Sequence, residues 1–394
     1  MMVEKTEKTM EFVREKMKVL EAISKKLELS ARIGMCLHIE PKTACLAMAL
    51  HKAGAQVFMC ASNPLSTKES AVSALRDAGV EVYARANESD EEYREGLNKV
   101  LDEKPEVIVD DGGDLGIEAH RRGLRVNGVS EETTTGVRRY RSLESAGELY
   151  FPVIDTNGAK CKHLFDNRFG TGQSALEGIM RSTNVSIAGK QFVVAGFGDV
   201  GKGIAERARG MGAHVIVSEV DPIRALEASM EGFSVMPIDR ACRVGEIFVT
   251  ATGDIDVISI ENIRMMRAGA ILANAGHFDV EVDRRIKGYR KEEVKPCVDR
   301  YDVDGKKVYL LGDGRLVNLV CADGHPVEIM DLSFSLQALA VKYLLESKLE
   351  PRVYPYPAEL DELVAKLKLA SMGIAIDELS EAQLEYLQRY EFGT

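Results

Sequence analysis

The chain has 394 residues, of which 45% are apolar and 29% are charged, and its formal net charge is −11. That length is enough for about two to three domains, and the composition is typical of a soluble globular protein. The acidic balance argues against a nucleic-acid partner, because phosphate binding needs basic patches.

Signals for targeting and for metal binding are weak. The first ten residues are charged and lack the apolar core of a secretory signal. No apolar run approaches the ~18 residues of a membrane helix. The seven cysteines include no C-x-x-C pair and are typical of small buried side chains in a reducing compartment. We therefore expect a cytoplasmic protein, outside the membrane, with no metal site.

Helix and strand patterns alternate through the first third of the chain. Apolar residues at helical spacing predict one amphipathic helix over 8–28. A further helix is expected to begin at Glu40 and Pro41, where the missing N–H of proline costs nothing. The other expected elements are strands at 32–38, 55–62, 80–84 and 106–111 and helices at 68–78 and 90–102. This alternation predicts a parallel sheet with helices on both faces.

Polar residues follow several of these strands. His38, Asn63 and Asp111 lie at strand ends, and the loops 110–114 (DDGGD) and 130–136 (SEETTTG) are rich in acids and threonines. Turn chemistry alone explains glycine, aspartate and threonine in loops. Ligands, however, gather at the carboxyl ends of strands in such sheets, so we favour a site here.

The segment 165–184 is expected to begin a helix that leads into a second domain. Lys162 and Asp166 are four residues apart and would share a face if this stretch is helical. A surface ion pair explains the spacing equally well, so the spacing alone leaves both interpretations open.

The stretch VVAGFGDVGKG (193–203) reads from an apolar strand into a glycine-rich turn that opens a helix. Its G-x-G-x-x-G is Gly196, Gly198 and Gly201, which suit a tight turn, a close approach to a pyrophosphate and close helix–strand packing. The strand 214–220 follows and carries Glu219, an acid placed for a ribose hydroxyl. The arrangement predicts a dinucleotide site, and the carboxylate favours NAD over NADP. Arg224 is the one residue that would suit NADP.

The remaining elements continue the α/β alternation. A long helix is expected over 327–347, and the charged tail, 357–394, is expected to be helical. Before them come a helix at 221–232 and strands within 234–238, 246–253 and 270–279.

Seven motifs in this order resemble the S-adenosyl-L-homocysteine hydrolase family over nearly the whole chain. They are CLH (36–38), DDGGDL (110–115), SEETTTG (130–136), FDN (165–167), GFGDVGKG (196–203), NAGHFD (274–279) and GRLVNLVCADGHP (314–326). The resemblance implies an α/β fold of two doubly wound parallel-sheet domains that assembles into a homotetramer. It also implies a substrate domain (1–157 and 328–360), interrupted by a Rossmann NAD domain (158–327), and a C-terminal helical segment (361–394).

The resemblance implies reversible hydrolysis of S-adenosyl-L-homocysteine, a small-molecule substrate, to homocysteine and adenosine. The C5′ carbon of the thioether is unactivated. Oxidation of the 3′-hydroxyl by bound NAD makes the C4′ proton acidic, so homocysteine thiolate can be eliminated. Water then adds, and the retained NADH reduces the ketone. NAD is thus recycled, and the closed site must retain it.

The resemblance assigns residues to each step. It implies four catalytic residues: His38 near C5′, Asp111 for the C4′ proton, Lys162 as the base for the 3′-hydroxyl, and Asp166. A lysine serves as a base only if its pKa is lowered. Substrate contacts are implied for these four side chains, except His38, and for Glu40, Lys42, Asn63, Glu132, His277, Asp323 and His325. Cofactor contacts are implied for Thr133, Thr134, Thr135, Asn157, Asn167, Gly196, Gly198, Asp199, Val200, Gly201, Gly203, Glu219, Arg224, Ala275, Gly276, His277 and Asn318.

One departure from the family pattern concerns the purine. The usual H-x-T-x-E or H-x-T-x-Q reads His38-Ile-Glu40-Pro-Lys42 here, and the usual Met before Gly-His-Pro is Asp323. Lys42 has donors and no acceptor, which suits the 6-oxo group of S-inosyl-L-homocysteine. Asp323 could neutralise Lys42 or accept from an adenine amino group. Hydrolysis of the inosyl compound is therefore the alternative hypothesis.

Two other departures concern the tail and a cysteine. The chain ends at EFGT without the final Lys and Tyr of long-tailed members, as in a short-tailed branch, and Thr171 replaces a common family cysteine. Two rival interpretations remain. A 2-hydroxyacid-type dehydrogenase would share the NAD domain, and a non-enzymatic regulator would have lost site residues.

Overall fold

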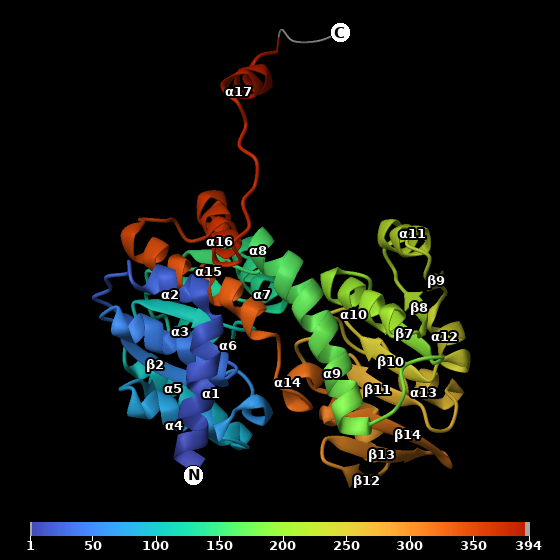
Figure 1. Cartoon of the computed structure of the whole chain (residues 1–394). Helices are drawn as coiled ribbons and strands as arrows, with labels where there is room; N and C mark the ends of the chain where they lie inside the picture. The colour runs from blue at the N-terminus through green and yellow to red at the C-terminus, as the bar shows by residue number, and fades with distance from the viewer. Residues whose placement is uncertain (1, 391–394) are drawn as a thin grey trace.

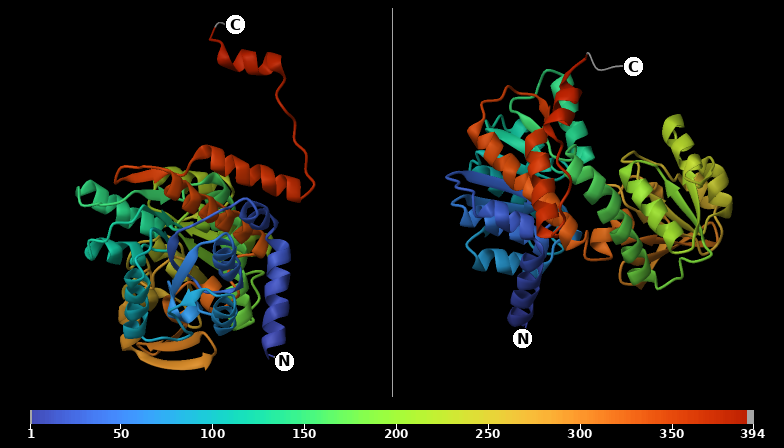
Figure 2. Two further views of the ribbon diagram at one scale, coloured as in Figure 1. Left: turned by 90° about the vertical axis from the view of Figure 1, so that its left-hand side faces the viewer. Right: turned by 45° about the horizontal axis from the view of Figure 1, so that its top comes forward.

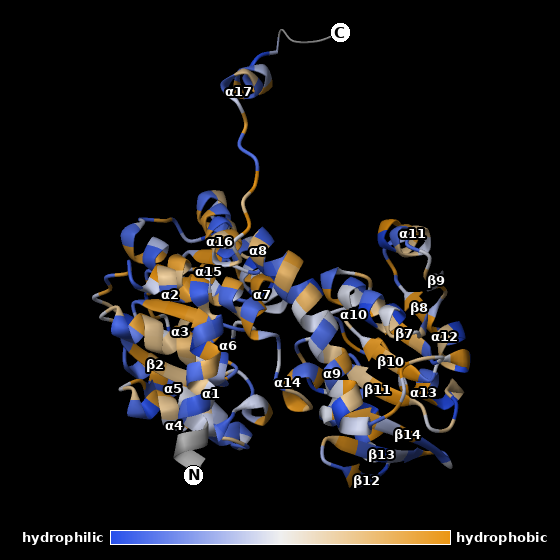
Figure 3. Cartoon of the chain, viewed as in Figure 1, coloured by the Kyte–Doolittle hydropathy of each residue, from blue (hydrophilic) through white to orange (hydrophobic). Residues whose placement is uncertain are grey.

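The computed structural model describes residues 2–390. Two α/β lobes lie side by side, with the helices α9 (Thr171–Thr183) and α14 (Val317–Val320) between them (Figure 1). Each lobe is built on one sheet, and the apolar strands lie inside while the helices turn polar faces outward (Figure 3). The α/β class predicted from the sequence is confirmed.

The first sheet has seven strands in the order β15-β6-β5-β4-β1-β2-β3, and every neighbouring pair is parallel. β15 comes from far along the chain and extends the edge beside β6. The strands are β1 (Arg32–Leu37), β2 (Gln56–Ala61), β3 (Glu81–Val82), β4 (Val107–Asp110), β5 (Gly128–Glu131), β6 (Val153–Asp155) and β15 (Val353–Pro355).

The second sheet has eight strands in the order β12-β13-β14-β11-β10-β7-β8-β9. It is parallel except at one edge, where β12, β13 and β14 pair antiparallel. The sequence patterns predicted no strands in that stretch. The strands are β7 (Gln191–Ala195), β8 (His214–Ser218), β9 (Ser234–Val235), β10 (Ile247–Thr250), β11 (Ile271–Asn274), β12 (Arg290–Lys295), β13 (Val298–Val303) and β14 (Lys306–Leu311).

Helices cover both sheets and form the tail. The α-helices are α1 (Met2–Lys16), α2 (Lys18–Ser24), α3 (Pro41–Lys52), α4 (Glu69–Asp77), α5 (Asp90–Asp102), α6 (Asp114–Arg121), α7 (Thr134–Ser145), α8 (Lys160–Lys162), α10 (Asp199–Gly210), α11 (Pro222–Met230), α12 (Ile238–Val244), α13 (Ile260–Met265), α15 (Val327–Glu346), α16 (Ala358–Ser371) and α17 (Glu381–Gln388). Short 3-10 turns are η1 (Pro64–Ser66), η3 (Arg284–Gly288) and η4 (Gly312–Gly314), and η2 (His163–Gly170) is a π-helix. No helix within residues 2–390 is long and apolar enough to cross a membrane.

The single helix predicted over 8–28 is wrong, because it divides into α1 and α2 at Met17. The Asp331 carboxylate accepts hydrogen bonds from the backbone N–H groups of Val19 and Leu20, at 2.9–3.2 Å. These are first-turn N–H groups of α2, which otherwise lack partners. A side chain more than 300 residues away thus defines the helix start, which no local pattern could reveal.

The C-terminal tail is only partly helical. The residues between α16 and α17 form no helix, and α17 stands apart from both lobes in Figure 1 and in the left view of Figure 2. The last residues of the expected segment, 391–394, include the EFGT ending and lie outside the described residues.

Close packing of α10 on η2 requires a small residue at Gly203. A Cβ there would lie 1.8 Å from the Arg168 backbone oxygen. We expect Gly203→Ala to lower stability by about 1–3 kcal/mol, because the backbones would have to separate. Thermal unfolding measures this effect. Gly210→Ala, on the same helix with no atom within 4 Å of the added Cβ, is the matched control and should stabilise slightly. Equal melting behaviour of the two variants would contradict the prediction.

Candidate active site

A cavity of about 800 Å³ lies between the lobes and takes its lining from both. It opens where β1 and β4 end in the first sheet and where β7, β8, β10 and β11 end in the second. This is the position expected for ligands of parallel sheets. All predicted site residues line the cavity except Asn63, Gly201, Gly203 and Asp323.

The exceptions have other surroundings. The side-chain oxygen of Asn63 accepts a hydrogen bond from the Leu65 N–H and so caps the turn η1. A Cβ on Gly201 would lie 1.9 Å from the Gly196 oxygen, so this glycine permits close packing of the turn, as does Gly203 on η2. Asp323 points outward, with its side chain 70% exposed.

The π-helix η2 brings Lys162 and its partners together. The Lys162 ammonium donates hydrogen bonds to Asp166 Oδ1 at 3.1 Å and to Asn167 Oδ1 at 2.9 Å. The wider turn of a π-helix, which is common at functional sites, lets the side chains four and five residues on meet the same group. The surface-pair interpretation is wrong, because Lys162 and Asp166 are buried.

Charge inside this cluster keeps Lys162 protonated. Burial alone would lower the pKa of Lys162, but the charges of Asp166 and Glu132 outweigh it and raise that pKa. Burial likewise would raise the pKa of Asp166, yet Lys162 and His325 hold it below its usual range. The lowered lysine pKa that a base requires is therefore absent from this arrangement.

Glu132 is the carboxylate of the cluster whose pKa lies near neutral. Burial raises its pKa to about 7, although the charge of Lys162, 3.5 Å away, opposes the shift. Glu132 Oε1 is buried and accepts no hydrogen bond. Such a carboxylate titrates near neutral pH, where an acid or base catalyst works best.

Two supporting residues were not predicted from the sequence. Ser333 donates a hydrogen bond to Asp166 Oδ2 at 2.6 Å, and Gln337 donates one to Glu132 Oε2. Both are fully buried on α15 and are four residues apart, so they share one face. The available signal was two polar side chains at helical spacing among the apolar residues of the expected helix.

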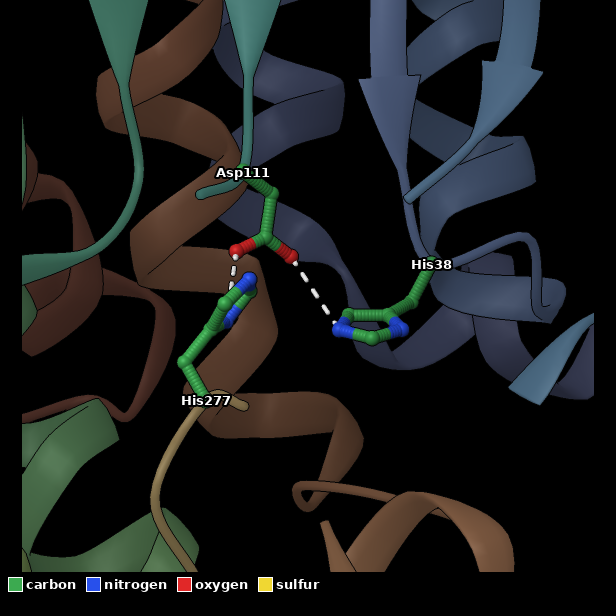
Figure 4. Close-up of side chains that lie close together, drawn as sticks. All are labelled: His38, Asp111 and His277. Carbon is green, nitrogen blue, oxygen red and sulfur yellow. Dashed lines mark ion pairs between the residues drawn. The ribbon is translucent and has the colours of Figure 1, made fainter. Parts of the chain in front are cut away.

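His38, Asp111 and His277 meet across the cavity (Figure 4). His38 Nε2 lies 3.3 Å from Asp111 Oδ2, and His277 Nδ1 lies 3.7 Å from Asp111 Oδ1. Asp111 Oδ1 is buried and accepts no hydrogen bond. Ligand atoms of the three residues lie within 4.8 Å of one another, an arrangement that could hold a metal ion. The spacing of the cysteines, on which the expectation of no metal site rested, did not predict this cluster.

Burial lowers the pKa of His38 to about 4, and the nearby His277 and His325 lower it further against the opposing charge of Asp111. His38 is therefore neutral at pH 7. Its neutral ring holds one proton, so one nitrogen can donate and the other can accept.

Lys42 and Glu40 form a second buried pair at the start of α3. The Lys42 ammonium lies 2.9 Å from Glu40 Oε2 and donates a hydrogen bond to the Asp323 backbone oxygen at 2.7 Å. The Asp323 carboxylate, which could have neutralised Lys42, instead binds Arg181 at 2.6 Å. Glu40 also accepts a hydrogen bond from the Lys42 N–H and so caps α3.

The other end of the cavity fits a dinucleotide. No side chain caps the N-terminus of α10 at Gly198, so its first N–H groups can face a pyrophosphate. Backbone N–H groups of Phe197, Val220 and Asp221 fix the Glu219 carboxylate beside the glycine turn. Arg224 lines the cavity near Gly198.

Several predicted residues link the two ends of the cavity. Asn167 donates a hydrogen bond to Asn157 Oδ1 at 3.0 Å, and Asn157 donates one to Thr134 Oγ1 at 2.9 Å. This chain joins the Lys162 cluster to the threonine loop. Asn318 Oδ1 is buried beside the cavity and has no hydrogen-bond partner, so it can accept one from a ligand. The cavity lining also includes Thr133, Thr135, Asp199, Val200, Ala275 and Gly276.

The fold and this cavity define a two-domain α/β protein that holds a dinucleotide beside a buried proton-transfer cluster. Residues 167–324 match the family model described as the S-adenosyl-L-homocysteine hydrolase NAD-binding domain, and residues 2–125 match that of S-adenosyl-L-homocysteine hydrolase. The chain is 51% identical to the S-inosyl-L-homocysteine hydrolase of Methanocaldococcus jannaschii, over 98% of this chain and 97% of that protein. It is 52% identical to the adenosylhomocysteinase of Thermotoga maritima, over 95% of each.

The chain therefore belongs to the S-adenosyl-L-homocysteine hydrolase family. It is an enzyme, and its cofactor is NAD. Among solved structures, it is similar to dipicolinate synthase from Bacillus halodurans, with a TM-score of 0.51, 12% identity and coverage of 80% of this chain and 99% of that one. At that identity the similarity extends to the fold alone.

Proposed function

We propose that this enzyme catalyses the reversible hydrolysis of S-adenosyl-L-homocysteine to homocysteine and adenosine. The observation that carries the proposal is the single cavity in which the Lys162–Asp166–Glu132 cluster, the His38–Asp111 pair and the uncapped α10 N-terminus meet. NAD, when bound, supplies reversible oxidation of the ribose 3′-hydroxyl to a ketone.

The chain's own residues move and hold protons. The Lys162 ammonium stabilises negative charge that develops on O3′, and Glu132, with its pKa near 7, accepts the hydroxyl proton. Asp166 and Asn167 orient the ammonium. Asp111 takes the C4′ proton, and His38 exchanges a proton with the sulfur or with water at C5′. This assignment moves the base from Lys162, which the resemblance had implied, to Glu132.

A second candidate substrate, S-inosyl-L-homocysteine, is favoured by one observation. Glu40 and the Asp323 carbonyl engage the Lys42 ammonium, and a third N–H remains free to donate to a 6-oxo purine. The Glu40 carboxylate favours the adenosyl substrate instead, because it can accept a hydrogen bond from an adenine 6-amino group. The two buried side chains thus determine which purine binds.

Turnover of the two substrates by the purified protein tests the proposal. A preference of at least tenfold for the adenine form would exclude the inosyl candidate, and the reverse preference would exclude the adenosyl one. Lys42→Gln, which supplies an amide oxygen as an acceptor, should shift the preference toward adenine by about tenfold, as expected for one hydrogen bond. The matched control is Lys52→Gln, at the exposed end of the same helix, which should leave the preference unchanged.

The same assay separates this function from a dehydrogenase. We infer that NAD stays bound and that no net NADH forms during turnover; release of NADH in proportion to product would contradict this.

We also propose that 1–157 and 328–360 bind substrate, that 158–327 bind NAD, and that the enzyme is a cytoplasmic homotetramer. Gel filtration with light scattering measures the last of these.

A further inference from the structure

A buried serine contacts the side of His38 that faces away from the cavity. Ser66, at the end of the turn η1, is only 2% exposed. Its Oγ lies 2.6 Å from His38 Nδ1 and donates a hydrogen bond to the Asn63 backbone oxygen at 2.9 Å. The opposite ring nitrogen, Nε2, faces Asp111 (Figure 4).

The hydroxyl geometry selects one form of the histidine. A serine has a single O–H donor, and here that donor is directed at the Asn63 oxygen. Ser66 Oγ can then accept from His38, which favours the tautomer with the proton on Nδ1. In that tautomer Nε2 carries a lone pair, and it lies 3.3 Å from Asp111 Oδ2.

We propose that Ser66 is a positioning residue that keeps the His38 proton on Nδ1 and so leaves Nε2 free to relay a proton between Asp111 and C5′. The proposal rests on the proposed function. Asn63, predicted to contact substrate, instead supplies the carbonyl that orients the serine.

The relay returns in the second half of the reaction the proton that it takes from C4′ in the first half. Asp111 takes the C4′ proton as the C5′–S bond breaks, the proton passes from Oδ2 to Nε2, and Nε2 delivers it to the departing thiolate. In the second half, water adds its oxygen to C5′ and gives its proton to Nε2. That proton returns through Asp111 to C4′. If Nε2 were already protonated at rest, it could not receive the first proton.

The tautomer can be measured directly. In ¹⁵N-histidine-labelled enzyme, the two ring nitrogens of a neutral histidine give distinct signals, and loss of signals in His38→Gln assigns His38 among the seven histidines. We expect the wild-type enzyme to hold the proton on Nδ1. A wild-type spectrum with the proton on Nε2 would overturn the proposal, whatever the activity of any variant.

Ser66→Ala tests the consequence. We expect the His38 proton to shift toward Nε2, and turnover to fall about tenfold or more, as expected for one lost hydrogen bond that orients a catalyst. Reduction of bound NAD by substrate, which does not use His38, should persist. Unchanged tautomer and turnover would contradict the proposal.

A matched control lies next along the chain. Thr67 is also buried and its hydroxyl donates to the same Asn63 oxygen, at 3.2 Å, but the structure gives it no contact with His38. Thr67→Val should leave both the tautomer and turnover unchanged. An equal loss of turnover in Ser66→Ala and Thr67→Val would show that the fold of the turn η1, and not the contact between Ser66 and His38, supports activity, and would overturn the proposal. A wild-type enzyme with the Nδ1 proton that hydrolyses neither thioether would instead refute the proposed function and leave the tautomer intact.

Discussion

Replacing Lys162 with alanine is expected to abolish reduction of bound NAD by substrate. The ammonium is buried between Asp166 and Glu132, and its loss removes the charge that stabilises the developing O3′ alkoxide. The rate of cofactor reduction, followed by the absorbance of the reduced nicotinamide, should fall by about 10²–10⁴-fold. Retained reduction would remove Lys162 from this step.

The same substitution leaves two buried acids without their partner, which commonly costs about 3–5 kcal/mol. Thermal unfolding must therefore accompany the assay. Lys162→Arg retains a charge in the same place and separates charge from geometry: partial reduction by this variant would indicate a purely electrostatic contribution. Lys160→Ala, exposed and two residues away, is the control and should behave as the wild type.

Asp111→Asn is expected to block exchange of the C4′ proton while leaving reduction of bound NAD intact. Substrate should still reduce bound NAD, because Lys162 keeps its contacts with Asp166 and Glu132. Exchange of the C4′ proton with solvent should fall by about 10²–10⁴-fold, since an amide cannot take that proton. Deuterium incorporation at C4′, measured by mass spectrometry, reports this step separately from cofactor reduction.

Normal C4′ exchange in Asp111→Asn would contradict the assignment. The substitution should preserve the turn, because the Asp111 backbone N–H is held by Asp110 Oδ1 at 3.0 Å. Asp102→Asn, an exposed carboxylate paired with Arg122 on the surface, is the matched control and should retain both reduction and exchange.

Much of the fold followed from periodicity and turn chemistry. Alternating strands and helices predicted the two sheets, and the glycine turn at Gly196 and Gly198 predicted the dinucleotide cavity. The antiparallel edge β12–β14 escaped prediction because β12 is polar and almost wholly exposed, and charged residues interrupt the apolar pattern of β13 and β14. The break in the first helix depends on Asp331, a tertiary contact without local signal.

The sequence predicted many of the residues that line the candidate site, but it did not predict how their charges shift one another's pKa values. The motifs placed Lys162, Asp111 and His38 in one cavity, as the structure does. Spacing could not show that two carboxylates raise the pKa of Lys162. It also could not show that Asp323 meets Lys42 through its backbone, because side-chain direction depends on Arg181, from a different helix.

The position of α15 along the chain has a consequence for biosynthesis. This helix carries Ser333 and Gln337 beneath the proton-transfer cluster, and β15 completes the first sheet. Both segments leave the ribosome only after the whole second sheet, while domains tend to fold from the N-terminus onward. The Asp166 and Glu132 carboxylates therefore lack the hydrogen bonds from Ser333 and Gln337 until more than 330 residues have been made. A nascent chain can shape its dinucleotide end early, but it cannot acquire a competent substrate site until synthesis is nearly finished.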